Sequence, residues 1–261
     1  MTLILPSLWF FLLGAAMGSF YNVLIDRLPE GRDVIRVRSS CSSCGTKLKI
    51  WDLIPIFSFL FLGGRCRYCK AKLSPWYLIS ELTVGTLFVG AFHLFAQNGN
   101  VLSLIAFLVL WSLLFIVAVM DWETGMIMDL FSLLIAVSGL VFSLLARRSI
   151  WQILLGAAAG FALYGLVYVI ARWVFKREGL GFGDVLLLGA IGFWLPWDQM
   201  IVTAFLTAYV SIIFIVILAI RDKKVGMKTE MPLGPSICLA TFLMNIFGER
   251  IMTFLLRILF A

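Results

Sequence analysis

Two aspartates in this 261-residue chain stand against long apolar stretches, where an ionised carboxylate is costly. Asp121 closes the run "LLFIVAVMD", and Asp184 opens "DVLLLGAIGFW" directly after Gly181 and Gly183. Two carboxyl groups brought together in a low-dielectric site share a proton, so one activates a water molecule while the other donates a hydrogen bond to the scissile carbonyl. This is aspartyl protease chemistry, and glycines beside Asp184 would let a substrate backbone approach closely.

Other chemistries fit the residues less well. The chain holds one histidine, His93, so a multi-histidine metal centre is excluded. The glycines of "GLGFGD" would need a preceding β-strand to bind a dinucleotide, and an apolar span precedes them instead. The acids Asp121, Asp129 and Asp184 would also serve a proton- or cation-coupled transporter, although the chain lacks a convincing internal repeat. A third hypothesis is a noncatalytic assembly protein.

Four cysteines form two close pairs, Cys41-x2-Cys44 and Cys66-x2-Cys69, with 21 residues between the pairs. This spacing is typical of tetrahedral thiolate coordination of zinc, and four cysteine ligands leave no open position for a catalytic water. Two disulfides or four free thiols are the alternatives, and a cytoplasmic location would disfavour the disulfides. The polar segment 26–75 has few apolar residues to build a core, so we expect the metal to supply its folding free energy.

The elements that position these residues are apolar helices. The chain is 62% hydrophobic and 13% charged, with a mean hydropathy of +1.04, which excludes an ordinary soluble domain. We expect an all-α polytopic membrane protein with about eight transmembrane helices and a small cytoplasmic zinc-binding domain between the first two. The expected domains are a first transmembrane helix (1–25), a four-cysteine zinc domain (26–75) and a membrane domain (76–261). The expected spans are 4–24, 76–96, 101–120, 127–146, 150–174, 184–197, 199–220 and 235–259.

The basic residues set the expected orientation. Seventeen of the 21 Lys and Arg residues fall in 26–75, 172–177 and 221–230, which share one side if there are eight spans. The positive-inside rule places that side, with the zinc domain and the acids, in the cytoplasm. Arg147 and Arg148 fall on the outside, against the rule. The net charge of +7 reflects this bias and contact with the lipid bilayer rather than nucleic acid.

Six motifs in order resemble the bacterial prepilin peptidase (type IV prepilin leader peptidase) family. They are "GAAMGSFYNVLIDRLP", the two C-x-x-C pairs with "WDLIPIFSFLFLGGR" between them, "LSPWYLISELTVG", the aspartate Asp121, the G-x-G-D motif ending at Asp184, and "MPLGPSICLA". Two positions depart from the family pattern: Met128 replaces a proline, and Leu186 replaces a lysine.

The resemblance implies a membrane aspartyl endopeptidase of the bacterial inner membrane, with Asp121 and Asp184 as its catalytic pair. Its substrates would be type IV prepilins or type II secretion pseudopilins, cut at the cytoplasmic face. Members with the cysteine domain also methylate the new N-terminus with S-adenosylmethionine.

We expect substrate contacts from Gly181, Gly183, Asp129 and Glu81. A partly desolvated Glu81 carboxylate would hold a sulfonium or an ammonium group. Pairing of Glu81 with a loop Arg or Lys is the equally open alternative.

Overall fold

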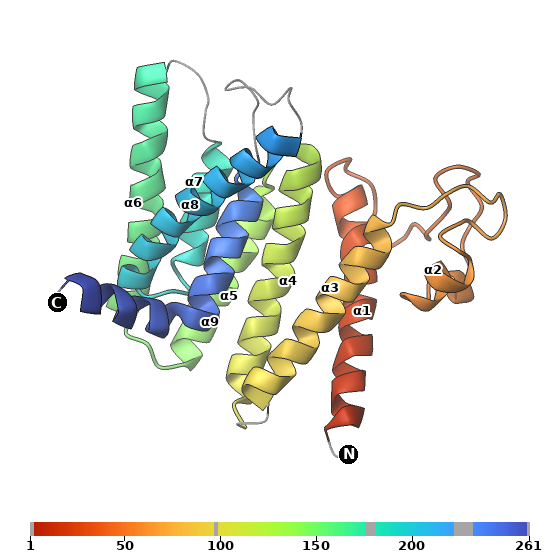
Figure 1. Ribbon diagram of the computed structural model, residues 1–261, viewed down its shortest axis with the longest axis horizontal. Coiled ribbons are helices and arrows are strands. Elements are labelled where there is room, and N and C mark those ends of the chain that lie inside the picture. The colour runs from red at the N-terminus through yellow and green to blue at the C-terminus, as the bar shows by residue number, and fades with distance from the viewer. Residues whose placement is uncertain (1–2, 97–98, 176–180, 222–231, 260–261) are drawn as a thin grey trace. The chain divides into compact units, whose positions relative to one another are not determined.

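The computed structural model describes residues 3–96, 99–175, 181–221 and 232–259 (Figure 1). Within these ranges the chain is helical, with two isolated β-bridges and no β-strand. The helices are α1 (Ile4–Arg27), α2 (Phe57–Phe61), α3 (Trp76–Ala91), α4 (Val101–Thr124), α5 (Asp129–Leu145), α6 (Ile150–Phe175), α7 (Phe182–Ile191), α8 (Trp197–Arg221) and α9 (Gly234–Leu259).

The predicted fold class is confirmed. Six of the described helices are long and apolar enough to cross a membrane, and α5 and α7 are shorter apolar helices at the positions of the fourth and sixth expected spans. The four-cysteine segment lies between α1 and α3, as the sequence predicted. The chain divides into two compact units, Met1–Leu108 and Val109–Ala261, which are described separately below.

The first unit is built on the packing of α1 against α3. Gly14 and Gly18 of α1 form a G-x-x-x-G pattern that lets the two backbones approach closely. A Cβ atom added at Gly14 would lie 2.7 Å from the carbonyl oxygen of Val84 and 2.9 Å from the Cα atom of Gly85. One turn further on, the buried amide of Asn22 donates a 2.7 Å hydrogen bond to the Ser80 hydroxyl. Small residues and one polar contact therefore fix the pairing of these helices.

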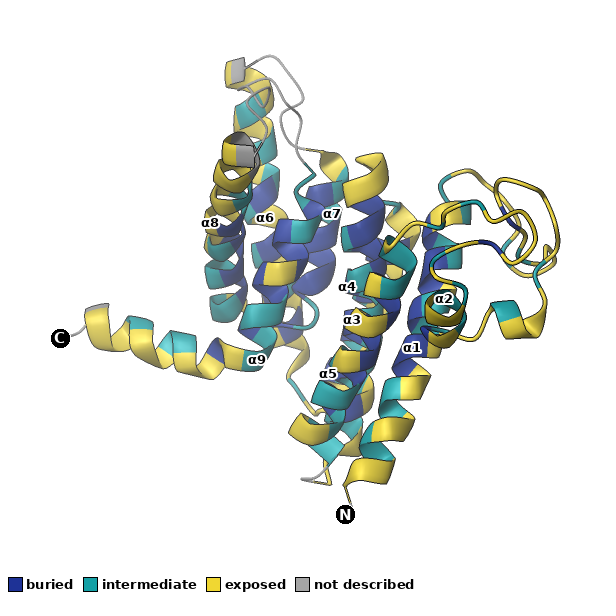
Figure 2. Cartoon of the chain, turned by 45° about the vertical axis from the view of Figure 1, so that its right-hand side comes forward, coloured by how far each residue is buried: buried dark blue, intermediate teal, exposed yellow. Residues whose placement is uncertain are grey.

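The second unit has the short helix α7 at its centre, in contact with α5, α6 and α9. Figure 2 colours α7 almost entirely as buried, and the side chains of Leu187, Leu188 and Ile191 have no exposed surface. A second G-x-x-x-G pattern, Gly156 and Gly160 on α6, faces α7 and the turn that follows it. A ten-residue helix with this packing is held by its neighbours, because so short a helix is marginal alone.

We predict that Gly156→Ala destabilises the second unit, because the added Cβ atom would lie 2.5 Å from the carbonyl oxygen of Leu195. Overpacking of this kind costs about 1–3 kcal/mol, seen as a lower melting temperature of the purified protein in detergent. The matched control is Gly165→Ala on the same helix, where the nearest atom, Val185 Cγ1, is 3.8 Å away. Equal melting temperatures for the two variants would contradict close packing of α6 on α7.

Arg147 and Arg148, which depart from the positive-inside pattern, have structural roles at the C-terminal end of α5. Arg147 adopts a left-handed backbone (φ 57°), and the Arg148 N–H donates to the Ser143 carbonyl, which together form a Schellman C-cap. The Arg148 guanidinium Nη1 donates to the Trp194 carbonyl oxygen at 2.8 Å and to the Ser143 hydroxyl at 3.0 Å. Arg148 thus ties the α5–α6 connection to the α7–α8 connection.

Candidate active site and metal centre

Asp121 lies three residues before the end of α4 and is 4% exposed. Its Oδ2 accepts a 2.7 Å hydrogen bond from the backbone N–H of Gly234, the first residue of α9. A Cβ atom at position 234 would lie 2.7 Å from the same oxygen, so this contact requires glycine. The positive end of the α9 dipole also favours a carboxylate here. Gly234 was not among the predicted site residues, although it belongs to the motif "MPLGPSICLA".

Asp184 is the third residue of α7 and is 8% exposed. Its Oδ2 accepts a 3.1 Å hydrogen bond from the N–H of Gly181, the N-cap residue, so the carboxylate caps its own helix. Gly183 packs closely on the segment before α5: a Cβ atom there would lie 3.1 Å from the Cβ atom of Ile127. Close packing on Ile127 accounts for a glycine at position 183, and contact of Gly181 and Gly183 with substrate stays a prediction.

Asp121 and Asp184 are both buried within the second unit. The carboxyl groups of Asp121 and Asp184 interact electrostatically with each other. Each is held by one backbone N–H through Oδ2, and among the described residues no hydrogen bond reaches either Oδ1. The arrangement leaves one oxygen of each carboxyl group for a water molecule or a substrate carbonyl.

Asp129 lies on a different helix from Asp121. Helix α4 ends at Thr124, and Gly125 follows it with a left-handed backbone (φ 66°). The exposed Asp129 is the first residue of α5. Among the described residues no hydrogen bond or ion pair joins Asp129 to Asp121 or Asp184, and its role stays a prediction. Met128 precedes it with φ −75°, a value that proline also adopts, so this departure from the family pattern leaves the backbone unchanged.

Glu81 is buried in α3 of the first unit, 7% exposed. Its Oε2 accepts a 2.6 Å hydrogen bond from the N–H of Ile56, and the Ser19 side chain also hydrogen-bonds to it. Ile56 has a left-handed backbone (φ 65°), which is strained for a β-branched residue and needs support from its surroundings. Among the described residues, Glu81 forms no ion pair with a loop Arg or Lys. Ile56 was missed at the sequence level because nothing in its type suggests such a contact.

The four cysteines form one cluster, and their Sγ atoms all lie within 4.8 Å of one another. The Cys41 and Cys69 sulfurs are 3.8 Å apart. This distance matches the edge of a tetrahedron with Zn–S bonds of about 2.3 Å, and it is far too long for a disulfide. The residues present therefore fit a metal held by four thiolates.

Two equivalent turns position these thiolates. In the first, Cys41 N–H donates to Thr46 and Gly45 N–H donates to Cys41, while Cys66, Lys70 and Ala71 repeat the pattern in the second. Gly45 (φ 68°) and Lys70 (φ 60°) hold the same left-handed position. The local repeat C-x-x-C-x-x-K-L thus folds twice into one shape.

Asp52 links the stretch between the turns to the second turn. Its carboxylate accepts hydrogen bonds from Arg67 Nε at 2.6 Å and from the Tyr68 hydroxyl at 3.1 Å. The Arg67 guanidinium holds the pKa of Asp52 below its usual value. Because the folded pKa is depressed, this contact stabilises the segment above the ordinary carboxyl pKa and is lost as the pH falls through the lowered value.

Comparison with known proteins gives consistent matches over most of the chain. The family model described as "Bacterial Peptidase A24 N-terminal domain" matches residues 12–95, and the one described as "Type IV leader peptidase family" matches residues 107–218.

Three similar relatives, each named "Prepilin leader peptidase/N-methyltransferase", come from Klebsiella pneumoniae, Burkholderia pseudomallei (strain 1026b) and Aeromonas hydrophila. The Klebsiella pneumoniae relative is 39% identical to this chain, and the match covers 75% of this chain and 89% of the relative. The Burkholderia pseudomallei relative is 29% identical, with 85% of this chain and 79% of the relative covered. The Aeromonas hydrophila relative is 30% identical, with 95% of this chain and 93% of the relative covered. No solved structure matches.

Proposed function

Because this chain belongs to the type IV leader peptidase family, we propose that it is a membrane aspartyl endopeptidase that removes the leader of type IV prepilins or type II secretion pseudopilins. It then methylates the new N-terminal amine. The buried pair Asp121 and Asp184 carries the proposal for the first reaction, because each carboxyl group is held by a backbone N–H and keeps one oxygen free.

The acid pair works as one proton-sharing unit. One carboxylate takes a proton from a water molecule, and the resulting hydroxide attacks the scissile carbonyl carbon while the other carboxyl group protonates the carbonyl oxygen. When the tetrahedral intermediate collapses, the C–N bond breaks, the leaving amine takes a proton from the pair, and a hydroxyl of the intermediate returns a proton to the pair as the new carboxyl group forms. Gly234 and Gly181 N–H groups fix the two carboxyl groups throughout.

The metal centre is structural in this proposal. Zinc bound by Cys41, Cys44, Cys66 and Cys69 stabilises segment 26–75, between a first transmembrane helix (1–25) and the membrane domain (76–261). With four thiolates the metal has no open position, so it takes no part in either reaction. The positive-inside pattern puts this domain and the acid pair on the cytoplasmic side of a bacterial inner membrane.

The test of the proposed function is prepilin processing by the purified protein in lipid vesicles. A prepilin with its leader is incubated with the protein, and gel electrophoresis follows the conversion to a shorter product. Mass spectrometry of the product N-terminus, with and without S-adenosylmethionine, reports methylation separately. If the prepilin stays full length after prolonged incubation, the proposed peptidase activity is wrong. The alternative is then the proton- or cation-coupled transporter that uses Asp121, Asp129 and Asp184.

The methyl-donor site is proposed to lie in the 14–85 region, with Glu81 as a contact. S-adenosylmethionine supplies an electrophilic methyl group on a cationic sulfur. The residues fit a cationic partner, since Glu81 is a buried carboxylate with no Arg or Lys partner among the described residues and is held by two neutral groups, the Ile56 N–H and the Ser19 side chain.

We predict that Glu81→Gln separates the two reactions. The glutamine oxygen still accepts the hydrogen bond from Ile56, so the turn is kept while the charge is lost. Methylation should fall by about tenfold or more, because a contact to a charged group is worth about 1.5–3 kcal/mol, while cleavage is retained. Mass spectrometry of the pilin N-terminus measures both. Loss of cleavage with intact methylation of pre-cleaved pilin would overturn this division. If both cleavage and methylation are unchanged in Glu81→Gln, Glu81 has no role in methyl transfer and only supports the turn at Ile56.

A further inference from the structure

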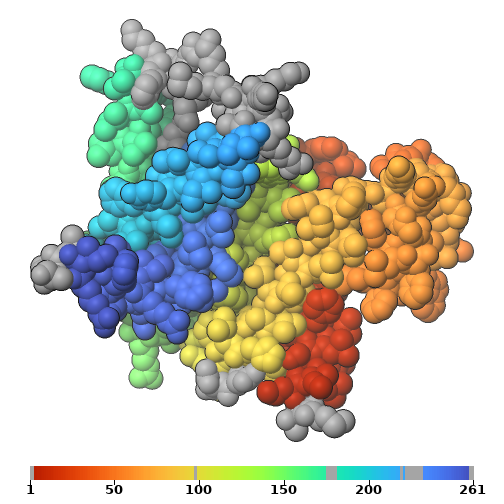
Figure 3. Space-filling view, in the orientation of Figure 1, coloured from red at the N-terminus to blue at the C-terminus, as the bar shows by residue number. Residues whose placement is uncertain are grey.

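The segment between α1 and α3 exposes a group of large apolar side chains. They lie on the 3₁₀ helix Ile50–Asp52 and on α2, which contact each other. Phe61 is 85% exposed and Trp51 is 71% exposed. The part of the chain that holds them stands out beside α3 in Figure 3, where it is orange. We call this group the α2 surface, and its members are Ile50, Trp51, Phe57, Leu60 and Phe61.

The α2 surface has no part in the site chemistry described above. The four thiolates and the turns that hold them need none of its five side chains, and neither do the two proposed reactions. Contiguous exposed apolar side chains are costly in water, and where a protein keeps them they mark a contact with another apolar body. The nearest apolar body to a segment that joins two candidate membrane spans is the bilayer itself.

The hydrogen bond between Ile56 and Glu81 sets the depth of the α2 surface. Ile56 directly precedes α2, and Glu81 is the sixth residue of α3, about 8 Å along the helix from its start. Ser19, which also contacts Glu81, stands about 12 Å from the end of α1. The 24 residues of α1 span about 36 Å, against about 30 Å for the hydrocarbon core of a bilayer. Helix α2 therefore begins at the boundary between headgroups and acyl chains.

Basic residues flank the α2 surface along the chain. Lys49 comes directly before Ile50, and Arg65 follows α2 after the two glycines Gly63 and Gly64. Both cations are exposed, and among the described residues neither of them forms an ion pair. Long basic side chains beside apolar ones are typical of helices that lie in an anionic membrane surface, with the cations at the headgroups. Tryptophan, here Trp51, is enriched at the same level.

We propose that the α2 surface inserts into the bilayer leaflet at which α1 ends and α3 begins. Its apolar side chains lie among the upper parts of the acyl chains, and Lys49 and Arg65 lie at anionic phospholipid headgroups. The segment that carries the four cysteines thus has a membrane contact of its own, in addition to the two helices that it joins. This contact does not depend on either proposed reaction.

The proposal is tested by photocrosslinking of the full chain in vesicles of dioleoyl phosphatidylethanolamine and dioleoyl phosphatidylglycerol in equal amounts. The photoreactive p-benzoylphenylalanine replaces Phe61 in one variant and Ile35 in the other. Ile35 is also an exposed apolar residue, 93% exposed, but it lies at the end of α1, because Arg27 Nη1 donates to the carbonyl oxygens of Asp33 and Val37 on either side of it. Position 61 should give about tenfold more phospholipid adduct than position 35, the scale of burying one phenylalanine side chain.

The cations are tested in the same chain with p-benzoylphenylalanine at position 61. Lys49→Gln together with Arg65→Gln should lower the share of phosphatidylglycerol among the adducts by about threefold, because the anionic headgroup loses both partners.

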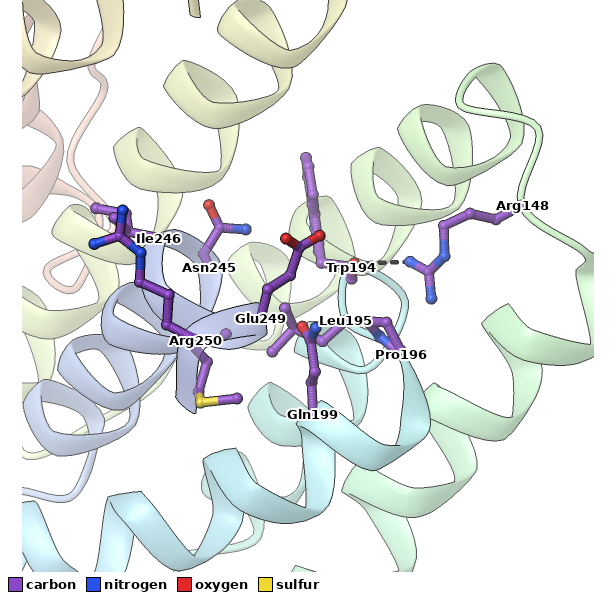
Figure 4. Close-up of a pocket in the computed structure, with 11 residues that line it drawn as sticks. Arg148, Trp194, Leu195, Pro196, Gln199, Asn245, Ile246, Glu249 and Arg250 are labelled. Atoms are coloured by element: carbon purple, nitrogen blue, oxygen red, sulfur yellow. Dashed lines mark hydrogen bonds between the residues drawn. The ribbon is translucent and has the colours of Figure 1, made fainter. Parts of the chain in front are cut away.

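The control for the cations is Arg250→Gln, which removes a positive charge at a cavity of about 530 Å³ in the second unit (Figure 4) and should leave that share unchanged. Melting temperatures show whether each variant is folded. An adduct yield at position 61 no higher than at position 35 would overturn the proposal, as would adducts of position 61 with a second copy of the chain in place of lipid. An unchanged share of phosphatidylglycerol in the Lys49 and Arg65 variant would overturn the role of the cations.

Discussion

Asparagine at either Asp121 or Asp184 is expected to abolish prepilin cleavage, with a loss of about 10³-fold or more in rate. The two carboxyl groups act as one unit that activates water, and such units lose nearly all of their activity when either member is removed. The fold should persist, because an asparagine oxygen still accepts the N–H of Gly234 or Gly181. Initial rates of prepilin shortening, with each variant reconstituted at equal amounts, measure the effect.

The matched control for these variants is Asp129→Asn, the same substitution at an exposed aspartate on the next helix. Asp129→Asn should change the rate of cleavage far less, because the turn at Gly125 between α4 and α5 separates Asp129 from Asp121 and Asp129 is exposed. An equal loss in Asp129→Asn would show that the wrong partner has been chosen. Substantial cleavage by the Asp121 or Asp184 variant would remove that residue from catalysis.

The second large effect is expected from Cys41→Ser or Cys66→Ser. Each variant should fail to retain the proposed zinc and should lose the order of segment 26–75, nearly all of which lies between α1 and α3. These two sulfurs are the buried members of the cluster, and metal binding is coupled to folding where few apolar side chains can form a core. Elemental analysis measures the metal, about one zinc per chain in the wild-type protein, and limited proteolysis measures the order of the segment.

Cys238→Ser is the control, since this fifth cysteine is buried in α9 and lies outside the cluster. It should keep the metal stoichiometry of the wild-type protein. Purified wild-type protein without stoichiometric metal would contradict the zinc proposal, whatever the cysteine variants do. An equal loss of zinc in Cys238→Ser would indicate that metal content follows general stability rather than the four ligands.

Local sequence was enough to predict most of the helices and the cluster of four cysteines. The lengths of the apolar runs set the helices, because a bilayer-spanning helix must satisfy every backbone group within itself. The two C-x-x-C turns close over a few residues each, so their spacing predicted one four-thiolate cluster. The G-x-x-x-G patterns of α1 and α6 stand in the sequence, but only the structure showed which helices they pack against.

Only the tertiary structure decided the partners of the buried polar groups. Asp121 accepts its hydrogen bond from Gly234, 113 residues away, and Arg148 reaches the Trp194 carbonyl, 46 residues away. Glu81 supports the strained Ile56 rather than a loop cation. No periodicity encodes such pairs, because each depends on how separate helices pack and where their ends meet. In an apolar interior an unpaired polar group costs far more than in water, so the packing that satisfies these groups together is the one the chain adopts.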